Sequence, residues 1–300
     1  MAYYESMKRL TLLVGPPGSG KSTLALDYCS KGGVTYINQD LQGKDHIRLF
    51  EEALSKGEDI VIDRMNFSKG QRNRYLDPAK ALGYSTHITV LHESYDVCLA
   101  RCLSRKDHLT IKDEESARAA LHTFFTKYER VSDDEADKVV RIWPEGYKPK
   151  AIICDLDGTL CDIDHRLHFV RDGKRNWPGF FAGIPGDKVN RWCAEILSEM
   201  ERHYKVVFCS GRPSDYREAT IDWLEKEMYD EGGCKYLDKY ELYMRSRNDS
   251  RKDNIAKEIL LDFEILTRYT PYFVIDDRQQ VVDMWRSRGY TCLQCAKGDF

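Results

Sequence analysis

The sequence lacks any hydrophobic run that approaches the ~20 apolar residues of a membrane span. Its first residues, MAYYESMKRL, lack the long apolar core of a signal peptide. Ten cysteines are scattered through the chain, and their spacing favours neither a zinc site nor a disulfide framework. We therefore expect reduced, mostly buried cysteines in a cytoplasmic protein that has no contact with a membrane.

A strong charge of one sign is also missing. The chain carries 46 Lys and Arg residues against 49 Asp and Glu residues, which gives a formal net charge of -3. A chain with so small a net charge has no overall positive electrostatic potential to attract a polyanion. Contact with a nucleic acid must therefore depend on a few local arginines. The 300 residues, of which 42% are hydrophobic, fit a globular protein with two domains of ordinary size.

The first motif present is a glycine-rich loop between an apolar strand, residues 9–14, and a helix, residues 23–30. The loop GPPGSGKS fits G-x-x-x-x-G-K-[ST], in which backbone N–H groups cradle phosphates at a helix N-terminus. Lys21 is expected to reach the β- and γ-phosphates of a nucleotide, and Ser22 to ligate Mg²⁺. The loop residues expected to bind ATP are Gly15, Gly18, Ser19, Gly20, Lys21, Ser22 and Thr23.

Acidic residues follow the next two expected strands. Asp40 comes after residues 35–38, and Asp63 comes directly after residues 60–62. Ligands of open α/β sheets bind beyond the C-terminal ends of the strands, so both carboxylates are expected near the phosphates. Asp40 can take the proton of an acceptor hydroxyl, or it can cap a helix that begins near Asp45. The sequence pattern leaves both interpretations open.

Two arginines end the helix expected over residues 95–104. Arg101 and Arg105 lie one turn apart on one face, where they either cover the transferring phosphate or face solvent. The combination of P-loop, I-N-Q-D, V-I-D-R-M-N and R-x-x-x-R resembles the polynucleotide 5′-hydroxyl kinases. The resemblance implies that Asp40 is the general base and that Asp63 helps to seat the acceptor. It also implies that Arg105 and Arg101 stabilise the transferring charge, with Arg101 counted in the ATP site.

One position departs from this resemblance. Such kinases can carry an arginine three residues after the base, where it holds the acceptor's phosphate, and this chain has Gly43 there. The sequence does not choose among the cations that can replace it, which are Lys44, Arg48, Arg64 and Arg72.

The second half of the chain is organised around AIICDLDGTL, residues 151–160. Its first four residues predict a buried parallel strand, and Asp155 and Asp157 follow at the strand's end. Strand side chains alternate, so both carboxylates are expected on one side, and Gly158 permits a sharp turn. Adjacent carboxylates repel each other unless a cation lies between them, which favours Mg²⁺. The alternative is a plain acidic turn.

A second pair of acids follows the strand expected over residues 272–275. Carboxylates at the ends of parallel strands meet at one edge of the sheet, so the two pairs are expected to form one Mg²⁺ site. The expected metal ligands are Ser22 in the first half and Asp155, Asp157, Asp276 and Asp277 in the second.

Two more motifs carry groups that suit a phosphate. The strand expected over residues 205–209 ends in S-G-R, where a hydroxyl beside a glycine can bond a phosphoryl oxygen. Asp253 and Lys257 form an i,i+4 pair on one helix face, which is either a surface ion pair or part of the site. The residues expected to bind substrate in these motifs are Ser210, Gly211, Arg212 and Asp253.

The D-x-D-G-T-L pattern, with the S-G-R, lysine and acid-pair motifs in order, resembles the haloacid dehalogenase superfamily of phosphotransferases. The resemblance implies that Asp155 is the nucleophile that forms an acyl phosphate. It implies that Asp157 is the general acid–base and that Lys257 offsets the negative charge of nucleophile and phosphate.

Between the first two of these motifs, residues 161–186 are rich in Arg, Gly and aromatic residues. This segment is either a cap that contacts phosphates and stacks bases or a loop packed by its own aromatic side chains. Arg166, eleven residues after the nucleophile, and Arg245, eight residues before Asp253, match the phage polynucleotide phosphatases. The resemblance implies that both arginines contact substrate.

Together the motifs predict an α/β protein with two doubly wound parallel-sheet domains. Residues 1–147 form a P-loop kinase domain, and residues 148–300 form a haloacid dehalogenase-like phosphatase domain with a small cap. The chain is similar throughout to the phage-type polynucleotide 5′-kinase/3′-phosphatases. The resemblance implies transfer of the ATP γ-phosphate to 5′-hydroxyl ends of DNA or RNA, removal of 3′-phosphate or 2′,3′-cyclic phosphate, and action with a ligase in the host cytoplasm.

Two other functions remain open from the sequence. A kinase–phosphatase of a small metabolite, such as a nucleoside or sugar phosphate, requires the same motifs but no arginine-rich cap. A nucleotide-sensing module would tolerate degenerate sites, whereas the key acids and the P-loop lysine are intact. The sequence does not distinguish DNA from RNA as the substrate, and it does not distinguish a monomer from a homo-oligomer.

Overall fold

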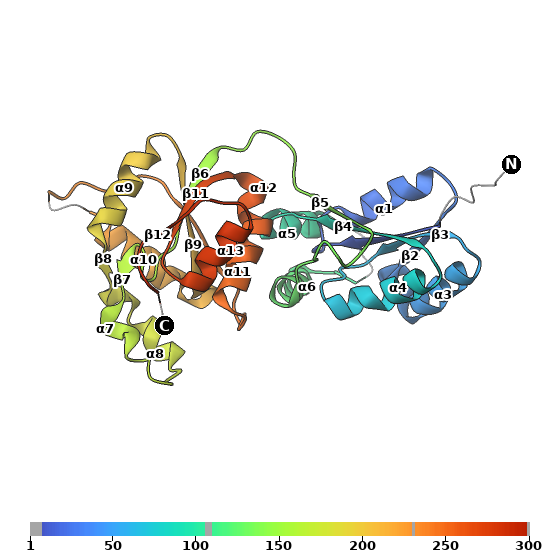
Figure 1. The fold of residues 1–300 in the computed structure, drawn as a ribbon, viewed down its shortest axis with the longest axis horizontal. Coiled ribbons are helices and arrows are strands. Elements are labelled where there is room, and N and C mark those ends of the chain that lie inside the picture. Colours follow the sequence, from blue (N-terminus) through green and yellow to red (C-terminus); the bar gives the residue numbers. More distant parts are fainter. Residues whose placement is uncertain (1–7, 106–109, 230–231, 299–300) are drawn as a thin grey trace. The chain divides into compact units, whose positions relative to one another are not determined.

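The computed structural model describes residues 8–105, 110–229 and 232–298, so the segment MAYYESM at the N-terminus lies outside the described residues. The chain divides into two compact units, one up to Glu145 and one from Gly146 (Figure 1). In the described part of the chain, no helix combines the length and the apolar character needed to cross a membrane.

The first unit contains a five-stranded parallel sheet in the order β2-β3-β1-β4-β5. Helix α1 covers one face, whereas α3 and α4 cover the other (Figure 1). The buried residues Leu13, Ala25 and Val61 join α1 to the sheet. The strands are β1 (Arg9–Val14), β2 (Val34–Asn38), β3 (Asp59–Asp63), β4 (Ser85–Leu91) and β5 (Lys138–Ile142). The α-helices are α1 (Lys21–Ser30), α2 (Gln39–Gln42), α3 (His46–Ser55), α4 (Lys69–Ala81), α5 (Tyr95–Ser104) and α6 (Glu114–Lys127).

The second unit contains another five-stranded parallel sheet, in the order β10-β9-β6-β11-β12. Its strands are β6 (Lys150–Cys154), β9 (Lys205–Pro213), β10 (Glu241–Arg245), β11 (Thr270–Asp276) and β12 (Cys292–Gln294). Its main helices are α9 (Arg191–Glu201), α10 (Arg217–Glu227), α11 (Asp253–Leu260) and α13 (Gln279–Ser287). A π-helical turn (Leu261–Ile265) and the short α12 (Leu266–Arg268) follow α11. The predicted fold class, two parallel-sheet α/β domains, is confirmed.

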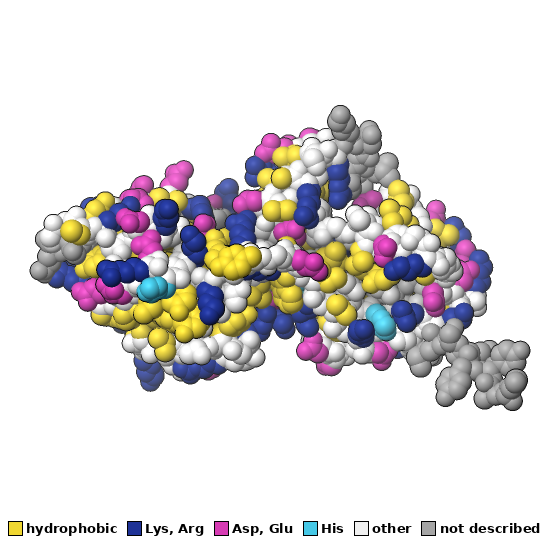
Figure 2. All heavy atoms as spheres, turned by 90° about the horizontal axis from the view of Figure 1, so that it is seen from above, with side chains coloured by type: hydrophobic (Ala, Val, Ile, Leu, Met, Phe, Trp, Pro, Cys, Tyr) yellow, Lys and Arg dark blue, Asp and Glu magenta, His cyan; other side chains and the backbone are white. Residues whose placement is uncertain are grey.

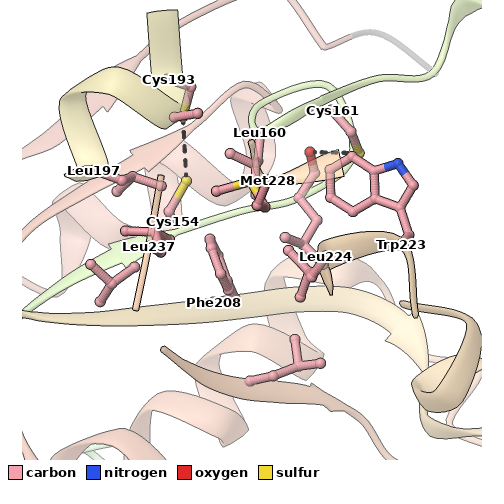
Figure 3. Packing of buried hydrophobic residues seen from close by; sticks show 14 of the residues in the cluster. Cys154, Leu160, Cys161, Cys193, Leu197, Phe208, Trp223, Leu224, Met228 and Leu237 are labelled. Carbon is pink, nitrogen blue, oxygen red and sulfur yellow. Dashed lines mark hydrogen bonds between the residues drawn. The ribbon is translucent and has the colours of Figure 1, made fainter. Parts of the chain in front are cut away.

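Successive side chains of β6 point to opposite faces of the sheet, so the core of this unit has two layers. Ile152 and Cys154 point to one face, where they meet α9 and α10 through Leu197 and Trp223. Ala151 and Ile153 point to the other face, where α11 and α13 lie. Figure 3 shows the first layer, in which the sulfur atoms of Cys154 and Cys193 lie 3.7 Å apart. A strand buried on both faces explains why residues 151–154 form a continuous apolar run.

The segment between β6 and β9 forms the small cap that the sequence predicts. The antiparallel pair β7 (Cys161–Asp162) and β8 (Lys188–Val189) closes its base, and α7 (Asp164–Leu167) and α8 (Trp177–Ala182) lie between them. The aromatic rings of this segment also contact one another, as in the Trp177–Phe180 and Phe180–Phe181 pairs. The segment is therefore packed by its own aromatic side chains, and its role as a cap over substrate stays a prediction.

The cysteines of the chain form no disulfide in the structure. The chain has one C-x-x-C segment, Cys292–Cys295, which our expectation of unpaired spacing overlooked, and all ten cysteines are free. Cys292 is buried in the core, and the Cys295 thiol contacts the Thr159 hydroxyl at 3.5 Å, so this pair contributes to packing.

Figure 2 shows basic and acidic side chains interspersed over the visible face, as the small net charge indicates.

Candidate active sites

The glycine-rich loop lies between β1 and α1. Gly18 has φ +83°, and a Cβ there would collide with the backbone of Cys98, so this position requires glycine. Lys21 is the first residue of α1 and is only 8% exposed. Its ammonium group donates a hydrogen bond to the Pro16 carbonyl at 2.7 Å. Burial lowers the pKa of Lys21, and the nearby charge of Asp63 opposes this shift. An anion in the loop can therefore replace the carbonyl as the partner of a pre-positioned cation.

A cavity of about 340 Å³ opens beside this loop. Several predicted kinase residues line it together, although they come from four different segments of the chain. These lining residues are Gly18, Gly20, Lys21, Ser22, Asp40, Asp63 and Arg105. Gly15, Ser19 and Thr23 belong to the loop and to the first turn of α1 without lining the cavity.

The two acids of this cavity differ in their surroundings. Asp63 ends β3, is buried, and accepts hydrogen bonds from the Tyr36 hydroxyl at 2.7 Å and the Asn38 amide at 2.8 Å. Asp40 lies in the first turn of α2, is exposed, and accepts a hydrogen bond from the Thr110 hydroxyl at 3.2 Å. Asn38 caps α2 by accepting from the Leu41 amide at 3.1 Å. Asp40 is therefore placed at the cavity and not at the start of the helix near Asp45.

The two arginines that the sequence grouped together are separated by their partners. Arg101 pairs with Glu93 at 3.0 Å and donates to the Gly18 carbonyl at 3.3 Å, so it supports the glycine-rich loop. Arg105 is the residue that lines the cavity, close enough to Lys21 for its positive charge to lower the lysine's pKa further. Of the two, Arg105 is the one that lines the cavity, and its contact with a transferring phosphate stays a prediction.

In the second unit, three carboxylates from two adjacent strands meet around a buried lysine. Asp155 follows β6, and Asp276 and Asp277 lie at the end of β11. Each of the three offers an oxygen atom within 4.8 Å of the others. The Lys257 ammonium group lies 2.9 Å from both Asp155 and Asp276. Burial raises the pKa of Asp155 well above its usual value, while Lys257 opposes that rise. Burial and the neighbouring Asp276 raise the pKa of Asp277 to about 6.

This donor set fits a divalent cation. Three oxygen donors of like charge suit a hard metal ion, and one lysine alone cannot neutralise them. The backbone also leaves room around the donors, because a Cβ at Gly158 or at Gly298 would collide with the Asp277 carboxylate. The expected ligands Asp155, Asp276 and Asp277 are thus brought together, whereas the Asp157 carboxylate faces elsewhere.

Asp157 lies between two buried arginines. Its carboxylate accepts from Arg166 Nη2 at 2.6 Å and from Arg212 Nε at 2.9 Å. Burial alone would raise the pKa of Asp157, but the two arginines outweigh burial and hold that pKa well below its usual range. Asp157 is therefore ionised in this state, and Arg166 and Arg212, both fully buried, contact it instead of opening into the cavity.

Asp187 is a further residue of this site that the sequence analysis missed. It is 2% exposed and accepts from Arg166 Nε at 2.6 Å and from Arg212 Nη2 at 2.8 Å. Its backbone carbonyl also accepts from the Trp223 indole at 2.8 Å. Asp187 thus fixes both arginines that hold Asp157. It follows no expected strand and belongs to no motif, so nothing local in the sequence marks it.

We predict that Asp187→Ala lowers the free energy of unfolding of the second unit by about 3–5 kcal/mol, because the two buried arginines then share the carboxylate of Asp157 and one buried positive charge is left uncompensated. Urea unfolding followed by tryptophan fluorescence checks this, since Trp223 bonds directly to Asp187. The matched control is Glu195→Ala on the exposed side of α9, which should change stability by less than about 0.5 kcal/mol. Equal stability of the two variants would contradict the prediction.

A cavity of about 520 Å³ opens in front of Asp155. Asp157, Gly211, Arg245 and Asp253 also line it, whereas Ser210 and Lys257 are buried behind. A Cβ at Gly211 would collide with Asp253, which explains the glycine there. Arg245 binds Asp253 at 3.0 Å. The remaining wall combines aromatic and basic side chains with the acid Asp249 and a few neutral residues. Its aromatic and basic members include Lys174, Arg175, Trp177, Phe181, Arg251, Lys252 and Arg278.

The fold and these two sites define a chain of two phosphate-handling α/β domains, one with a P-loop and one with an aspartate cluster and a buried lysine. Residues 149–300 match the family described as the polynucleotide kinase PNKP phosphatase domain. The chain belongs to this family. The resemblance to polynucleotide kinase/phosphatases that the motifs carry is thereby confirmed.

Similar proteins have related names. A protein of Autographa californica nuclear polyhedrosis virus named as a bifunctional polynucleotide kinase/RNA ligase is 26% identical over 94% of this chain and 41% of its own length. A protein of Acanthamoeba polyphaga mimivirus named as a bifunctional polynucleotide phosphatase/kinase is 34% identical over 34% of this chain and 24% of its own. This chain thus spans less than half of the length of either relative. A chain of the Pnkp1/Rnl/Hen1 RNA repair complex is 27% identical over the full length of both chains, with a TM-score of 0.42.

Proposed function

We propose that this chain heals nucleic-acid ends, with residues 1–147 as a polynucleotide 5′-kinase and residues 148–300 as a polynucleotide 3′-phosphatase. ATP is the phosphate donor, Mg²⁺ is the metal of both sites, and the products are ends that a ligase can join. The observation that carries the proposal is the composition of the 520 Å³ cavity, where basic and aromatic side chains line the space in front of Asp155. Such a wall suits a polyanion with stacking bases better than a sugar phosphate.

In the kinase site, Asp40 accepts the proton of the acceptor's 5′-hydroxyl as its oxygen attacks the γ-phosphorus. Lys21 leaves the Pro16 carbonyl and binds the phosphates, and Arg105 stabilises the charge that develops on the transferring group. Ser22 would hold the metal ion, which would offset phosphate charge.

In the phosphatase site, a carboxylate oxygen of Asp155 attacks the 3′-phosphate, and the bond from phosphorus to the 3′-oxygen breaks. The leaving oxygen takes a proton from Asp157, and water then hydrolyses the acyl phosphate to release inorganic phosphate. Asp157 must gain this proton from solvent water after substrate binds, because the arginines keep it ionised beforehand. The negative charge of a bound phosphate raises the pKa of Asp157 and so favours that step. Asp155, Asp276 and Asp277 would hold the metal, which would offset charge at the phosphoryl group.

Incubation with labelled ATP and either a 5′-hydroxyl oligonucleotide or a nucleoside tests the proposal. We expect label transfer to the oligonucleotide at a kcat/KM well above that for the nucleoside. Release of phosphate from a 3′-phosphorylated oligonucleotide, measured in parallel without ATP, tests the other site. Phosphorylation of the nucleoside but not of the oligonucleotide would support the metabolite kinase and defeat the repair function.

A further inference from the structure

The first unit has a second cavity, which is lined by different residues from the cavity beside the glycine-rich loop. Its volume is about 260 Å³, near the lower end of the range for small-ligand cavities, roughly 300 Å³. The lining residues come from β1, β3, β4 and β5 and from the end of α1 and the start of β2. Polar residues among them are Arg9, Thr11, Asp59, His87, Thr89 and Lys138.

This cavity opens on the face of the sheet that α1 covers only in part. Leu13 and Val61 pack under α1. Because side chains alternate along a strand, Thr11 and Arg9 point to the same face as Leu13. Helix α1 packs mainly on β1, β2 and β3. The same face of β4 and β5 therefore lies beside the helix, and residues of these two strands form the far wall of the cavity.

The parallel register places three polar side chains in one row across this face. Thr11 of β1 is paired with His87 of β4, and His87 is paired with Lys138 of β5. Arg9 lies two residues before Thr11, and Thr89 lies two residues after His87, so both point to the same face as the row. Two cationic side chains, an imidazole and two hydroxyls thus surround one cavity.

The cationic groups of this set have no acidic partner in the part of the chain that the structure describes. Neither the Arg9 guanidinium nor the Lys138 ammonium group forms an ion pair there. The acid in the cavity wall, Asp59, accepts a hydrogen bond from the Arg9 backbone N–H at 2.9 Å. Burial lowers the pKa of His87, and the charges of Arg9 and Lys138 lower it further, against the opposing charge of Asp137. Both cations therefore lie close to the His87 ring.

The hydroxyl and imidazole groups also have unused hydrogen-bonding capacity. Thr11 and Thr89 are 8% and 4% exposed, and neither hydroxyl has a hydrogen-bond partner among the described residues. The His87 Nε2 atom contacts the Ser85 hydroxyl at 3.2 Å, and its Nδ1 atom has no partner within the same residues. Polar groups that are nearly buried usually have partners. These groups therefore suit a ligand that accepts several hydrogen bonds.

We propose that this cavity binds a phosphate group, held by the side chains of Arg9 and Lys138 and by the hydroxyl of Thr11. A phosphate combines negative charge with more acceptor oxygens than a carboxylate offers, which matches cationic and hydroxyl donors from three strands. The phosphate belongs either to a small molecule or to the backbone of a polynucleotide, and both present the same chemistry. The inference does not depend on the proposed function, because the cavity contains none of the residues assigned to either active site.

The test is an NMR titration of the full chain without ATP, followed at the imidazole of His87. The chain has eight histidines, and the His87 signal is identified by its loss in His87→Gln. The probes are inorganic phosphate and an oligonucleotide with a 5′-phosphate and a 3′-hydroxyl, which is a substrate of neither proposed activity. Sodium chloride at equal ionic strength and pH is the control titrant. The local signal separates this cavity from phosphate bound at the two active sites.

We expect the His87 signal to shift to saturation. Saturation by inorganic phosphate at a lower concentration than by the oligonucleotide identifies a small-molecule site, and the reverse order identifies a site for a polynucleotide backbone. Lys138→Gln and Arg9→Gln should each raise the Kd about 3- to 10-fold, because each removes a charged donor. Thr11→Val should raise the Kd by a smaller factor without lowering the free energy of unfolding, since its hydroxyl loses no partner within the fold.

Lys56→Gln is the matched control, because Lys56 is an exposed cation that follows α3 and lies outside the cavity. It should leave the Kd within about twofold of wild type. A shift that stays linear with both probes, or that sodium chloride reproduces, would overturn the inference. Binding by Lys138→Gln and Arg9→Gln as tight as that of wild type would also overturn it. Because the readout is local to His87, failure of either proposed activity would leave this result intact.

Discussion

Asp155→Asn should reduce the rate of 3′-phosphate release by about 10³-fold or more while the kinase rate stays within about twofold. The substitution removes the attacking oxygen, so the acyl phosphate cannot form. It keeps the size of the side chain, and Lys257 retains Asp276 at 2.9 Å and Asp253 at 3.6 Å, so the buried lysine is not left without an acidic partner. Initial rates with a 3′-phosphorylated oligonucleotide measure the effect.

The control for this prediction is Asp222→Asn, which removes an exposed carboxylate on α10. That variant should behave as wild type in both assays. A 3′-phosphatase rate within tenfold of wild type in Asp155→Asn would show that another group attacks phosphorus, and the nucleophile assignment would then be wrong.

Lys21→Met should abolish measurable 5′-kinase activity, with a loss of about 10²- to 10³-fold or more, and should leave 3′-phosphatase activity unchanged. Lys21 is the buried cation at the glycine-rich loop, and its interaction with phosphate strengthens as charge develops during transfer. Methionine keeps much of the length of the side chain without the charge. Transfer from labelled ATP to a 5′-hydroxyl oligonucleotide measures the loss.

Lys31→Met is the matched control, because Lys31 follows α1 and its side chain is 67% exposed beside Asp27. We expect no change in either activity. If Lys21→Met also removed phosphatase activity from a chain that unfolds at the wild-type temperature, the two sites would not be independent.

The residues that the sequence predicted well are those whose position follows from local spacing. The P-loop, Asp63, Asp155 and the pair Asp276-Asp277 each end or follow a parallel strand, and parallel strands end at a common edge. The i,i+4 spacing of Asp253 and Lys257 also holds, with their charged groups 3.6 Å apart. For these groups, local pattern and sheet geometry suffice.

The residues that the sequence did not place depend on contacts between distant segments. Asp157 was expected beside the metal, but Arg166 and Arg212, the second of them 55 residues away, hold its carboxylate in another direction. Asp187 completes this network through pairings 21 and 25 residues away in the sequence. Arg72 and Arg64 looked equivalent in the sequence, but Arg72 binds the buried Glu135, whereas Arg64 lines the cavity beside the glycine-rich loop. Such pairings have no period along the chain, so no sequence pattern reveals them.

The central claim is that one chain carries two independent phosphorus chemistries that act on opposite ends of a polynucleotide. A single oligonucleotide with a 5′-hydroxyl and a 3′-phosphate, incubated with ATP and Mg²⁺ and analysed by mass spectrometry, tests it directly. Wild type should add a phosphate at the 5′ end and remove the one at the 3′ end. Lys21→Met should change only the 3′ end and Asp155→Asn only the 5′ end, and a mixture of the two variants should change both. Failure of the wild type to change either end, or loss of both conversions in a folded single variant, would contradict the account.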